Sequence, residues 1–447
     1  MHIDMIMCYT IDEKEEWHMA KIKIDPTQDS FRSYIAKGNY YIDKTEIIHE
    51  YLEESFESKI MFTRPWRFGK TMIMTMFRDF LDNTRKSEEL FKGLKIMEHK
   101  DLVNLYMNKY PVIFLSLKEV KGFSFEDIYD LFRDKVSEVY RTHSYLLSNN
   151  DLEDADKEKF SRIRNGEATR SATMLGISFL CEMLKKHWNK GVFVIIDEYD
   201  VPIASAIGTP SYDKILNMIQ EMLSSVCKTN DNVESVMISG CLYTVKNSGY
   251  TGLNNIRPKT VLTNRYSEYF GFTNQEVKQT LAAAGYLDKY DEVREWYDGY
   301  IFGNTHIYNP WDVMNYIDYL NDNDGNSPDE PELFWANTSE TRLNLVHGFL
   351  GRTADAQEGF ERLLTDKPFV KIINEHIPYH KLHESGESLW AGLLETGYLT
   401  KAEQQQRKGT ISLCIPNNEI KKVFQQEVYD YFKTHCGIPM QRERRIP

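Results

Sequence analysis

"MFTRPWRFGKTMIMTMF", residues 61–77, ends a short apolar run and opens a segment with apolar residues at helical spacing. Gly69, Lys70 and Thr71 match the last three positions of a phosphate-binding loop, which usually reads G-x-x-x-x-G-K-[ST]. The first glycine of that pattern falls at position 64, where this chain has Arg64. The stretch predicts a strand, a loop and a helix. The loop is either a nucleotide site of altered sequence or an ordinary turn with an exposed lysine.

A second stretch, "VFVIIDEYD" at residues 192–200, favours the nucleotide site. Its apolar strand ends in Asp197 and Glu198. A nucleotide hydrolase needs a carboxylate at the end of a strand to hold Mg²⁺, and a group that orients the attacking water. In a parallel sheet this strand and the loop end at the same edge, where ligands bind. The alternative is a simple acidic strand cap, which we consider weaker beside a G-K-T turn.

The next apolar run, "VMISG", ends at Ser239 and Gly240. Because this run also ends at the predicted ligand-binding edge, the Ser239 hydroxyl is placed to touch a γ-phosphate or the attacking water. A Ser-Gly turn that merely ends the strand is an equally weighted alternative.

The apolar runs indicate an α/β fold. They lie at 59–63, 111–117, 192–197 and 233–240, with a weaker fifth at 259–264. Continuous apolar runs that alternate with helical patterns are typical of a parallel sheet covered by helices on both faces. We therefore predict a P-loop NTPase domain over residues 28–266, after an N-terminal extension over residues 1–27.

The remainder of the chain has a different pattern. Residues 267–365 predict a helical region that contains an acidic linker, and Thr273 with Glu276 predicts a capping box at a helix start. The order helix, helix, strand, strand, helix predicts a small winged-helix-like domain within residues 366–447.

Composition limits the function classes. The net charge of −13 gives nucleic acid no broad attraction, although a local basic groove stays open. The six cysteines form no C-x-x-C pair, which argues against a disulfide framework and favours a reducing cytoplasm. We expect neither a secretory signal nor a membrane-spanning segment, because the N-terminus lacks a basic start and no window approaches 18 apolar residues.

The chain resembles the AAA-ATPase-like proteins, a divergent P-loop group common in anaerobic bacteria. The matching stretches are "YYIDKTEII" at 40–48, "TRPWRFGKT" at 63–71, "VIIDEYDVPI" at 194–203, "SGYTGLNNI" at 248–256, "YFGFTNQEV" at 269–277, "WYDGYIFGNTHIYNPWDVMNYI" at 296–317, "FWANTS" at 334–339 and "LWAGLLETGYLT" at 389–400. In this family a loop without the first glycine is normal.

The resemblance implies ATP and Mg²⁺ as ligands, with Walker A and Walker B elements at the loop and at the acidic strand end. It implies that Lys70 and Glu198 are catalytic and that Thr71 and Asp197 hold Mg²⁺. The predicted nucleotide-binding residues are Arg67, Phe68, Gly69, Lys70, Thr71 and Ser239. Asp200 also matches a family position.

Two departures bear on activity. The chain has Trp66 and Tyr243 where the family usually has arginine, while Lys246 is retained. If the second arginine stabilises phosphate charge, hydrolysis here is slow. Members of the family often carry a C-terminal PD-(D/E)XK nuclease domain, and its clustered carboxylates and lysine are not recognisable in this sequence.

We therefore predict a cytoplasmic Mg²⁺-dependent ATPase that acts as a nucleotide switch. The sequence leaves open whether it binds a protein partner or nucleic acid. The alternative is a non-hydrolysing nucleotide-binding or interaction module, a truncated relative of the nuclease-bearing ATPases. Intact Lys70, Thr71, Asp197 and Glu198 favour the first prediction, and Tyr243 favours the second.

Overall fold

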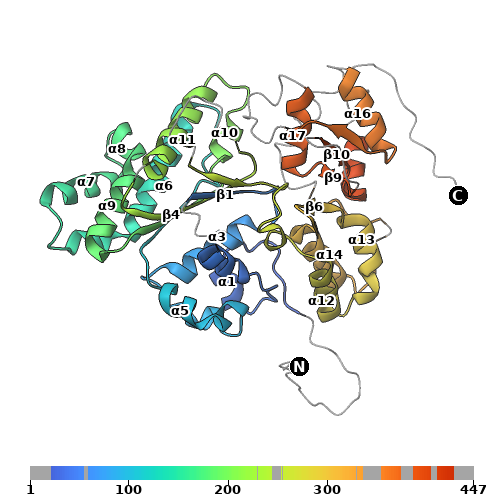
Figure 1. Cartoon of the computed structure of the whole chain (residues 1–447), viewed down its shortest axis with the longest axis horizontal. Helices are drawn as coiled ribbons and strands as arrows, with labels where there is room; N and C mark the ends of the chain where they lie inside the picture. Colours follow the sequence, from blue (N-terminus) through green and yellow to red (C-terminus); the bar gives the residue numbers. More distant parts are fainter. Residues whose placement is uncertain are drawn as a thin grey trace, which may run out of the picture.

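The computed structural model describes residues 22–54, 59–228, 230–243, 253, 255–328, 330–335, 354–373, 386–403 and 410–426. A five-stranded sheet with helices forms the first part of the molecule. The second part contains a two-stranded and a three-stranded sheet among further helices, and it lies beside the end of the large sheet (Figure 1).

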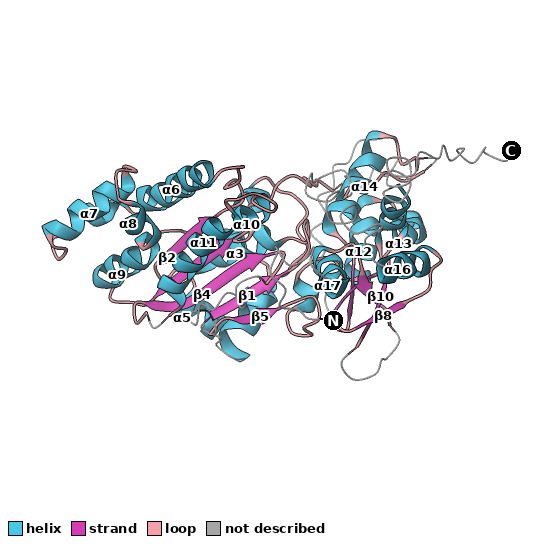
Figure 2. Ribbon diagram, turned by 90° about the horizontal axis from the view of Figure 1, so that it is seen from above, coloured by secondary structure: helices cyan, strands magenta, loops and turns pink. Residues whose placement is uncertain are grey.

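The large sheet is parallel throughout and has the order β2-β3-β4-β1-β5. Its strands are β1 Lys59–Thr63, β2 Val112–Ser116, β3 Val192–Asp197, β4 Val233–Gly240 and β5 Arg257–Lys259. Figure 2 shows β2, β4, β1 and β5 side by side. This confirms the predicted α/β class. Because the strands are parallel and β4 lies between β1 and β3, the loop at residues 64–69 after β1 and the acidic end of β3 meet at one edge.

Helices cover both faces of this sheet. Successive strand residues face opposite sides, so that Met61 belongs to one hydrophobic cluster while Ile60 and Phe62 belong to another. The first cluster includes residues of α6 (Phe125–Thr142), α9 (Gly176–Trp188) and α11 (Tyr212–Cys227), and the second includes residues of α1 (Phe31–Ala36), α3 (Lys70–Leu81) and α5 (Lys100–Tyr106). Figure 1 shows α1, α3 and α5 on one side of the sheet, and α11 and α10 (Val201–Ser205) on the other.

The helices of the first part are α1 Phe31–Ala36, α2 Glu46–His49, α3 Lys70–Leu81, α4 Glu88–Phe91, α5 Lys100–Tyr106, α6 Phe125–Thr142, α7 Asp154–Arg164, α8 Arg170–Met174, α9 Gly176–Trp188, α10 Val201–Ser205 and α11 Tyr212–Cys227. Short turns of other helical types are η1 Glu50–Glu54, which is π-helical and continues α2, and the 3₁₀ turns η2 Lys95–Glu98 and η3 Ser144–Ser148.

The elements of the second part are α12 Asn274–Ala284, α13 Tyr290–Tyr297, β6 Tyr300–Phe302, β7 Thr305–Ile307, α14 Pro310–Asp322, α16 Ala354–Leu364, β8 Phe369–Lys371, α17 Gly386–Thr396, β9 Thr400–Lys401 and β10 Ile411–Cys414. Residues 418–426 form a further helix. The capping box of Thr273 and Glu276 at the start of α12 is confirmed. None of the described helices is both long and apolar enough to cross a membrane.

The fifth strand was predicted in the wrong place. The sequence favoured residues 259–264, whereas β5 ends at Lys259. The Thr260 hydroxyl accepts a hydrogen bond from the N–H of Leu262 at 3.2 Å, and the N–H of Thr260 donates to the Thr263 hydroxyl at 3.1 Å. These side chains offer the backbone a turn in place of the sheet ladder, so the strand stops before the apolar residues that suggested it.

The C-terminal sheet contains β8, a strand that the sequence did not predict. The central strand β10 pairs antiparallel with β9 on one side and with β8 on the other. Helix α16 packs on this sheet, since Phe360 contacts the ring of Trp390 in a cluster that also contains Phe369. The order α16, β8, α17, β9, β10 with β10 central is compatible with a winged helix, and that interpretation of residues 366–447 stays a prediction.

Candidate functional site

The loop between β1 and α3 combines two left-handed residues. Gly69 has φ 79° and is the N-cap of α3, and Arg67 has φ 68°. A Cβ at Gly69 would meet no atom within 4 Å, so the backbone conformation and not crowding favours glycine there. These two residues turn the chain sharply from the strand into the helix.

The loop leaves a row of backbone donors for a ligand. The first intrahelical bond here runs from the N–H of Ile73 to the carbonyl of Gly69 at 3.1 Å. Among the described hydrogen bonds, none uses the N–H groups of residues 66–72. Unpaired N–H groups at a helix start, together with the helix dipole, favour an anion such as a phosphate.

Lys70 is buried inside this loop. Its ammonium donates to the carbonyls of Arg64 at 3.2 Å and Pro65 at 3.1 Å, and it lies 3.3 Å from Glu198 Oε1. Burial by itself disfavours the charge, but the surrounding acidic groups outweigh it and raise the pKa of Lys70. Lys70 is therefore a buried cation that pairs with the Glu198 carboxylate.

Thr71, Asp197 and Ser239 form one hydrogen-bonded group across three elements. Thr71 Oγ1 donates to Asp197 Oδ2 at 3.0 Å, and Ser239 Oγ donates to Asp197 Oδ1 at 2.6 Å. The N–H of Glu198 donates to Ser239 Oγ at 3.3 Å. Burial, and then the nearby charge of Glu198, raise the pKa of Asp197 to about 6 against the lowering effect of these hydroxyls and of Lys70.

These contacts distinguish the roles of the predicted residues. The Ser239 side chain is fully buried behind Asp197, and the described lining of the cavity beside the loop does not include it. Ser239 is thus placed to orient Asp197 and Glu198, while Lys70, Thr71 and Glu198 line the cavity.

Asp200 holds the turn that follows β4. Its Oδ2 accepts hydrogen bonds from the N–H of Cys241 at 2.8 Å and of Leu242 at 3.0 Å. Burial, and then the charge of Glu198, raise the pKa of Asp200 to about 6. Glu198 therefore contacts Lys70 directly, and the nearby charges of Asp197 and Asp200 also stabilise the ammonium.

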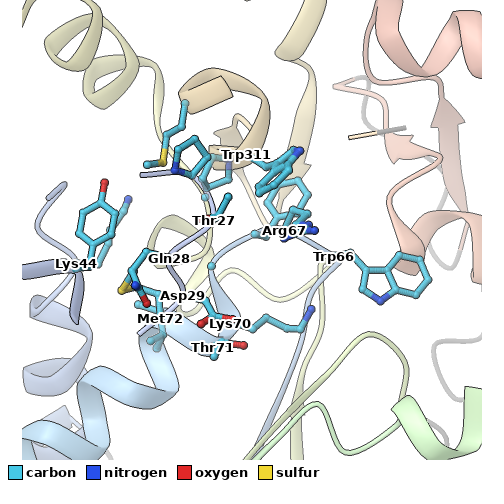
Figure 3. A pocket seen from close by; sticks show the side chains of 18 of the residues that line it. Thr27, Gln28, Asp29, Lys44, Trp66, Arg67, Lys70, Thr71, Met72 and Trp311 are labelled. Atoms are coloured by element: carbon cyan, nitrogen blue, oxygen red, sulfur yellow. The ribbon is translucent and has the colours of Figure 1, made fainter. Parts of the chain in front are cut away.

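The cavity beside the loop has a volume of about 500 Å³. Figure 3 shows Lys70 and Thr71 on one side of it and Thr27, Gln28 and Asp29 beside them. Lys44 and Trp311 also line the cavity, and the Arg67 guanidinium lies 3.9 Å from the ring centre of Trp311. The space is large enough for a ligand of nucleotide size.

The loop between β1 and α3 is also packed into the second part of the molecule. Phe68 belongs to the same hydrophobic cluster as Tyr300 and Phe302, with ring centres 5.0 Å away in each case. The indole N–H of Trp335 donates to the carbonyl of Trp66 at 3.1 Å. What Phe68 can offer a phosphate is therefore its backbone N–H.

Gly397 allows the segment after α17 to approach Pro65 in the loop. A Cβ at this residue would lie 2.9 Å from Cβ of Pro65, and its φ of 89° is in the left-handed region. The segment after α17 therefore touches the loop directly.

The donor set at Thr71 and Asp197 fits Mg²⁺. A threonine hydroxyl and a carboxylate meet at 3.0 Å beside the helix start, and oxygen ligands with several waters are what Mg²⁺ prefers. These two residues are the ones that could hold such an ion.

The two residues that replace the usual arginines of the family, Trp66 and Tyr243, have different surroundings. Tyr243 is 2% exposed and belongs to the hydrophobic cluster on the α6–α9–α11 face, away from the described lining of the cavity. Lys246 lies outside the described residues. Trp66 lines the cavity through part of its surface.

Sequence reasoning missed part of the cavity wall. Residues 24–29, assigned mostly to an extension, line the cavity with Lys44 and Trp311. The stretches "NYYIDKT" and "YNPWDVM" carried a signal, because they are aromatic and lie next to turns. Nothing in their spacing indicates that they face the loop.

Comparisons with known proteins identify a family for the first part of the chain. Residues 27–248 match the family model AAA-ATPase_like, described as "Predicted AAA-ATPase". A curated relative from Azotobacter chroococcum mcd 1, described as an uncharacterized protein in the vnfD 5' region, is 30% identical over 278 residues. The match covers 62% of this chain and 48% of the relative, so the chain spans about half of that protein's length.

Proposed function

Since the chain belongs to the AAA-ATPase-like family through residues 27–248, we propose that it binds ATP with Mg²⁺, hydrolyses it, and uses the bound nucleotide as a switch. One observation carries the proposal most directly. Thr71 and Asp197 meet at 3.0 Å beside a helix start whose N–H groups have no described partner. The N–H groups suit the phosphates of a nucleoside triphosphate, and the hydroxyl and carboxylate suit its metal ion.

Lys70 and Glu198 would exchange partners during binding. The lysine contacts Glu198 Oε1 at 3.3 Å, and Glu198 Oε2 is buried without a described hydrogen-bond partner. A triphosphate in the loop would draw the ammonium toward its β- and γ-phosphates. The released carboxylate could then orient the attacking water and accept its proton.

The metal ion would neutralise charge on the phosphates and on the leaving group. Asp197 and Thr71 would hold it, and Ser239 would keep the Asp197 carboxylate in place through the 2.6 Å hydrogen bond. The backbone N–H groups of the loop would stabilise the charge that develops on the transferred phosphoryl group.

A second candidate function is a nucleotide-binding module that does not hydrolyse ATP. It is favoured by Tyr243, which is buried where the family usually has an arginine, and by the lysine–glutamate contact that occupies the proposed catalytic carboxylate. In that case ATP would still bind, and phosphate would not be released.

Lys70→Ala tests the proposal. It removes charge-assisted contacts to phosphate, so ATP affinity measured by calorimetry is expected to fall at least about tenfold. The matched control is Lys92→Ala, which removes an exposed lysine paired with Glu89 at the end of α4. Phosphate release with and without Mg²⁺ is measured in parallel. Binding without release supports the second candidate, and equal ATP affinity in both variants contradicts the site.

A further inference from the structure

Two histidines and a glutamate converge on the surface near α2. Glu46 and His49 lie on α2, and His99 lies at the start of α5. Glu46 Oε1 is 2.7 Å from His99 Nε2 and 3.4 Å from His49 Nδ1. The two imidazole rings are stacked with their centres 3.8 Å apart. One atom from each of the three side chains lies within 4.8 Å of the others, which is close enough for all three to ligate a single ion.

A second carboxylate, that of Glu53, orients the His49 ring so that Nδ1 lies toward Glu46. Glu53 Oε2 lies 2.9 Å from His49 Nε2, on the other side of the ring. A carboxylate at that distance favours the tautomer with the proton on Nε2, which leaves the lone pair of Nδ1 facing Glu46. A lone pair opposite an anionic oxygen is unfavourable unless a cation or a proton lies between them. Metal-binding histidines are commonly oriented by a carboxylate in this way.

The two segments are held in place before any ion binds. The N–H of Lys95 donates to Asp43 Oδ2 at 2.7 Å, and the N–H of Ile96 donates to Thr45 Oγ1 at 3.1 Å. These bonds fix the backbone that leads to His99 against the residues that precede α2. Ligands on braced segments lose little freedom when they bind an ion.

From these contacts we propose that Glu46, His49 and His99 bind a divalent transition-metal ion of the Zn²⁺ type. Two imidazoles and one carboxylate are ligands that Zn²⁺ takes, whereas Mg²⁺ prefers oxygen. The three side chains are 22% to 34% exposed, so an ion can reach them and water can complete the coordination. Glu53 is a positioning residue, since it acts through His49. This site is separate from the proposed Mg²⁺ site, because it uses none of the loop residues.

The ion would join α2 to the start of α5. Lys44, two residues before Glu46, lines the cavity. A metal at this position would therefore brace one wall of the proposed nucleotide site from outside. The inference does not need ATP hydrolysis, so it can fail or succeed independently of the proposed function.

The test is titration of the full chain with Zn²⁺ by calorimetry, and with Co²⁺ by visible absorption, in excess Mg²⁺ and without nucleotide. We expect one Zn²⁺ site and a Co²⁺ spectrum with nitrogen ligation. His99→Gln and His49→Gln should each weaken Zn²⁺ binding at least about tenfold, and Glu53→Gln should weaken it by about 10- to 100-fold.

His306→Gln is the matched control, because His306 also pairs with a single glutamate, Glu403, at 3.1 Å but has no second histidine in that contact. It should bind Zn²⁺ like the unchanged chain. The chain has 12 histidines, so the comparison among variants decides the location. No stoichiometric Zn²⁺ binding, or equal binding in His49→Gln, His99→Gln and His306→Gln, would overturn the proposal. Circular dichroism verifies that each variant is folded.

Discussion

Arg64 explains why this loop does without its first glycine. The residues with positive φ in the loop are Arg67 and Gly69, and Arg64 is not among them. The Arg64 side chain is fully buried and donates to the carbonyls of Thr63 at 2.7 Å and Lys259 at 2.6 Å. Position 64 therefore needs no special backbone conformation, and its side chain fastens the loop to β5.

Restoring the usual glycine is expected to harm the protein. Burial lowers the pKa of Arg64 to about 9 while the charge of Glu395 opposes this, so the guanidinium stays charged at pH 7. Arg64→Gly would remove this group, its packing over the rings of Phe270 and Phe302, and two hydrogen bonds. We expect a loss of roughly 2–4 kcal/mol in the free energy of unfolding, measured in urea. A variant of unchanged stability that binds ATP more tightly would contradict this role.

Asp197 and Glu198 are adjacent but are expected to act differently. Asp197 faces Thr71 and Ser239, whereas Glu198, at φ 53°, faces Lys70. Glu198→Gln should retain ATP binding and reduce phosphate release about 10²- to 10⁴-fold. Asp197→Asn should remove the Mg²⁺ dependence of ATP affinity. Calorimetry and a phosphate-release assay separate the two effects, and full turnover in Glu198→Gln would point to a different base.

The elements that the sequence predicted best are those with buried apolar runs. β1 to β4 each contain a continuous run of at least three buried or partly buried apolar residues, because both faces of the sheet are covered. The fifth strand was predicted too far along the chain, because the hydroxyls of Thr260 and Thr263 stabilise a turn there. The pattern of apolar residues does not reveal such a turn. β8 has three residues, of which Phe369 alone is buried. Strands this short are specified by their neighbours more than by their own sequence.

His143 makes the end of α6 sensitive to acid. Burial lowers the pKa of His143 from 6.5 to about 4, although the charge of Asp82 opposes this. The folded protein thus binds this proton less readily than the unfolded chain, so its stability falls as the pH decreases from about 6.5 to 4. The difference in pKa corresponds to about 3 kcal/mol.

The measurement compares urea unfolding of the unchanged chain and of His143→Gln at pH 7 and pH 4.5. Asp197 and Asp200 have raised pKa values and act in the opposite direction between pH 6 and 4, so only the difference between the two proteins isolates His143. We expect the acid-induced loss to be about 2–3 kcal/mol smaller in the variant. An identical pH dependence in both proteins would show that His143 is not buried in its neutral form.

At the scale of the whole molecule, the sequence predicted the residues at the sheet edge but not the groups that surround them. Lys70, Thr71, Asp197 and Glu198 come together because parallel strands end at one edge. The wall formed by residues 24–29 and Trp311 depends on how the second part packs on the first. That packing is determined by contacts between segments hundreds of residues apart, which leave no periodic pattern in either segment.

Trp335 is expected to couple the second part to the loop. Its indole N–H donates to the carbonyl of Trp66 at 3.1 Å, and its side chain is fully buried. Trp335→Phe removes this bond of about 1 kcal/mol, so ATP affinity should fall roughly fivefold. Trp188→Phe is the control, because its N–H bond to Tyr145 lies at the far end of α9. Equal ATP affinity in both variants, measured by calorimetry, would argue against coupling.

The strand order also has a consequence for biosynthesis. Of the strands that the structure describes, β1 is the first to leave the ribosome, yet within that set it pairs only with β4 and β5, in a register that joins Ile60 to Met237. At about 5–20 residues per second, the intervening chain takes roughly 10–35 s to be translated. During that interval the apolar strand that leads into the phosphate loop has no partner in its own sheet. The nascent chain must therefore keep this segment from aggregating, by local burial under α1 and α3 or with the help of a chaperone.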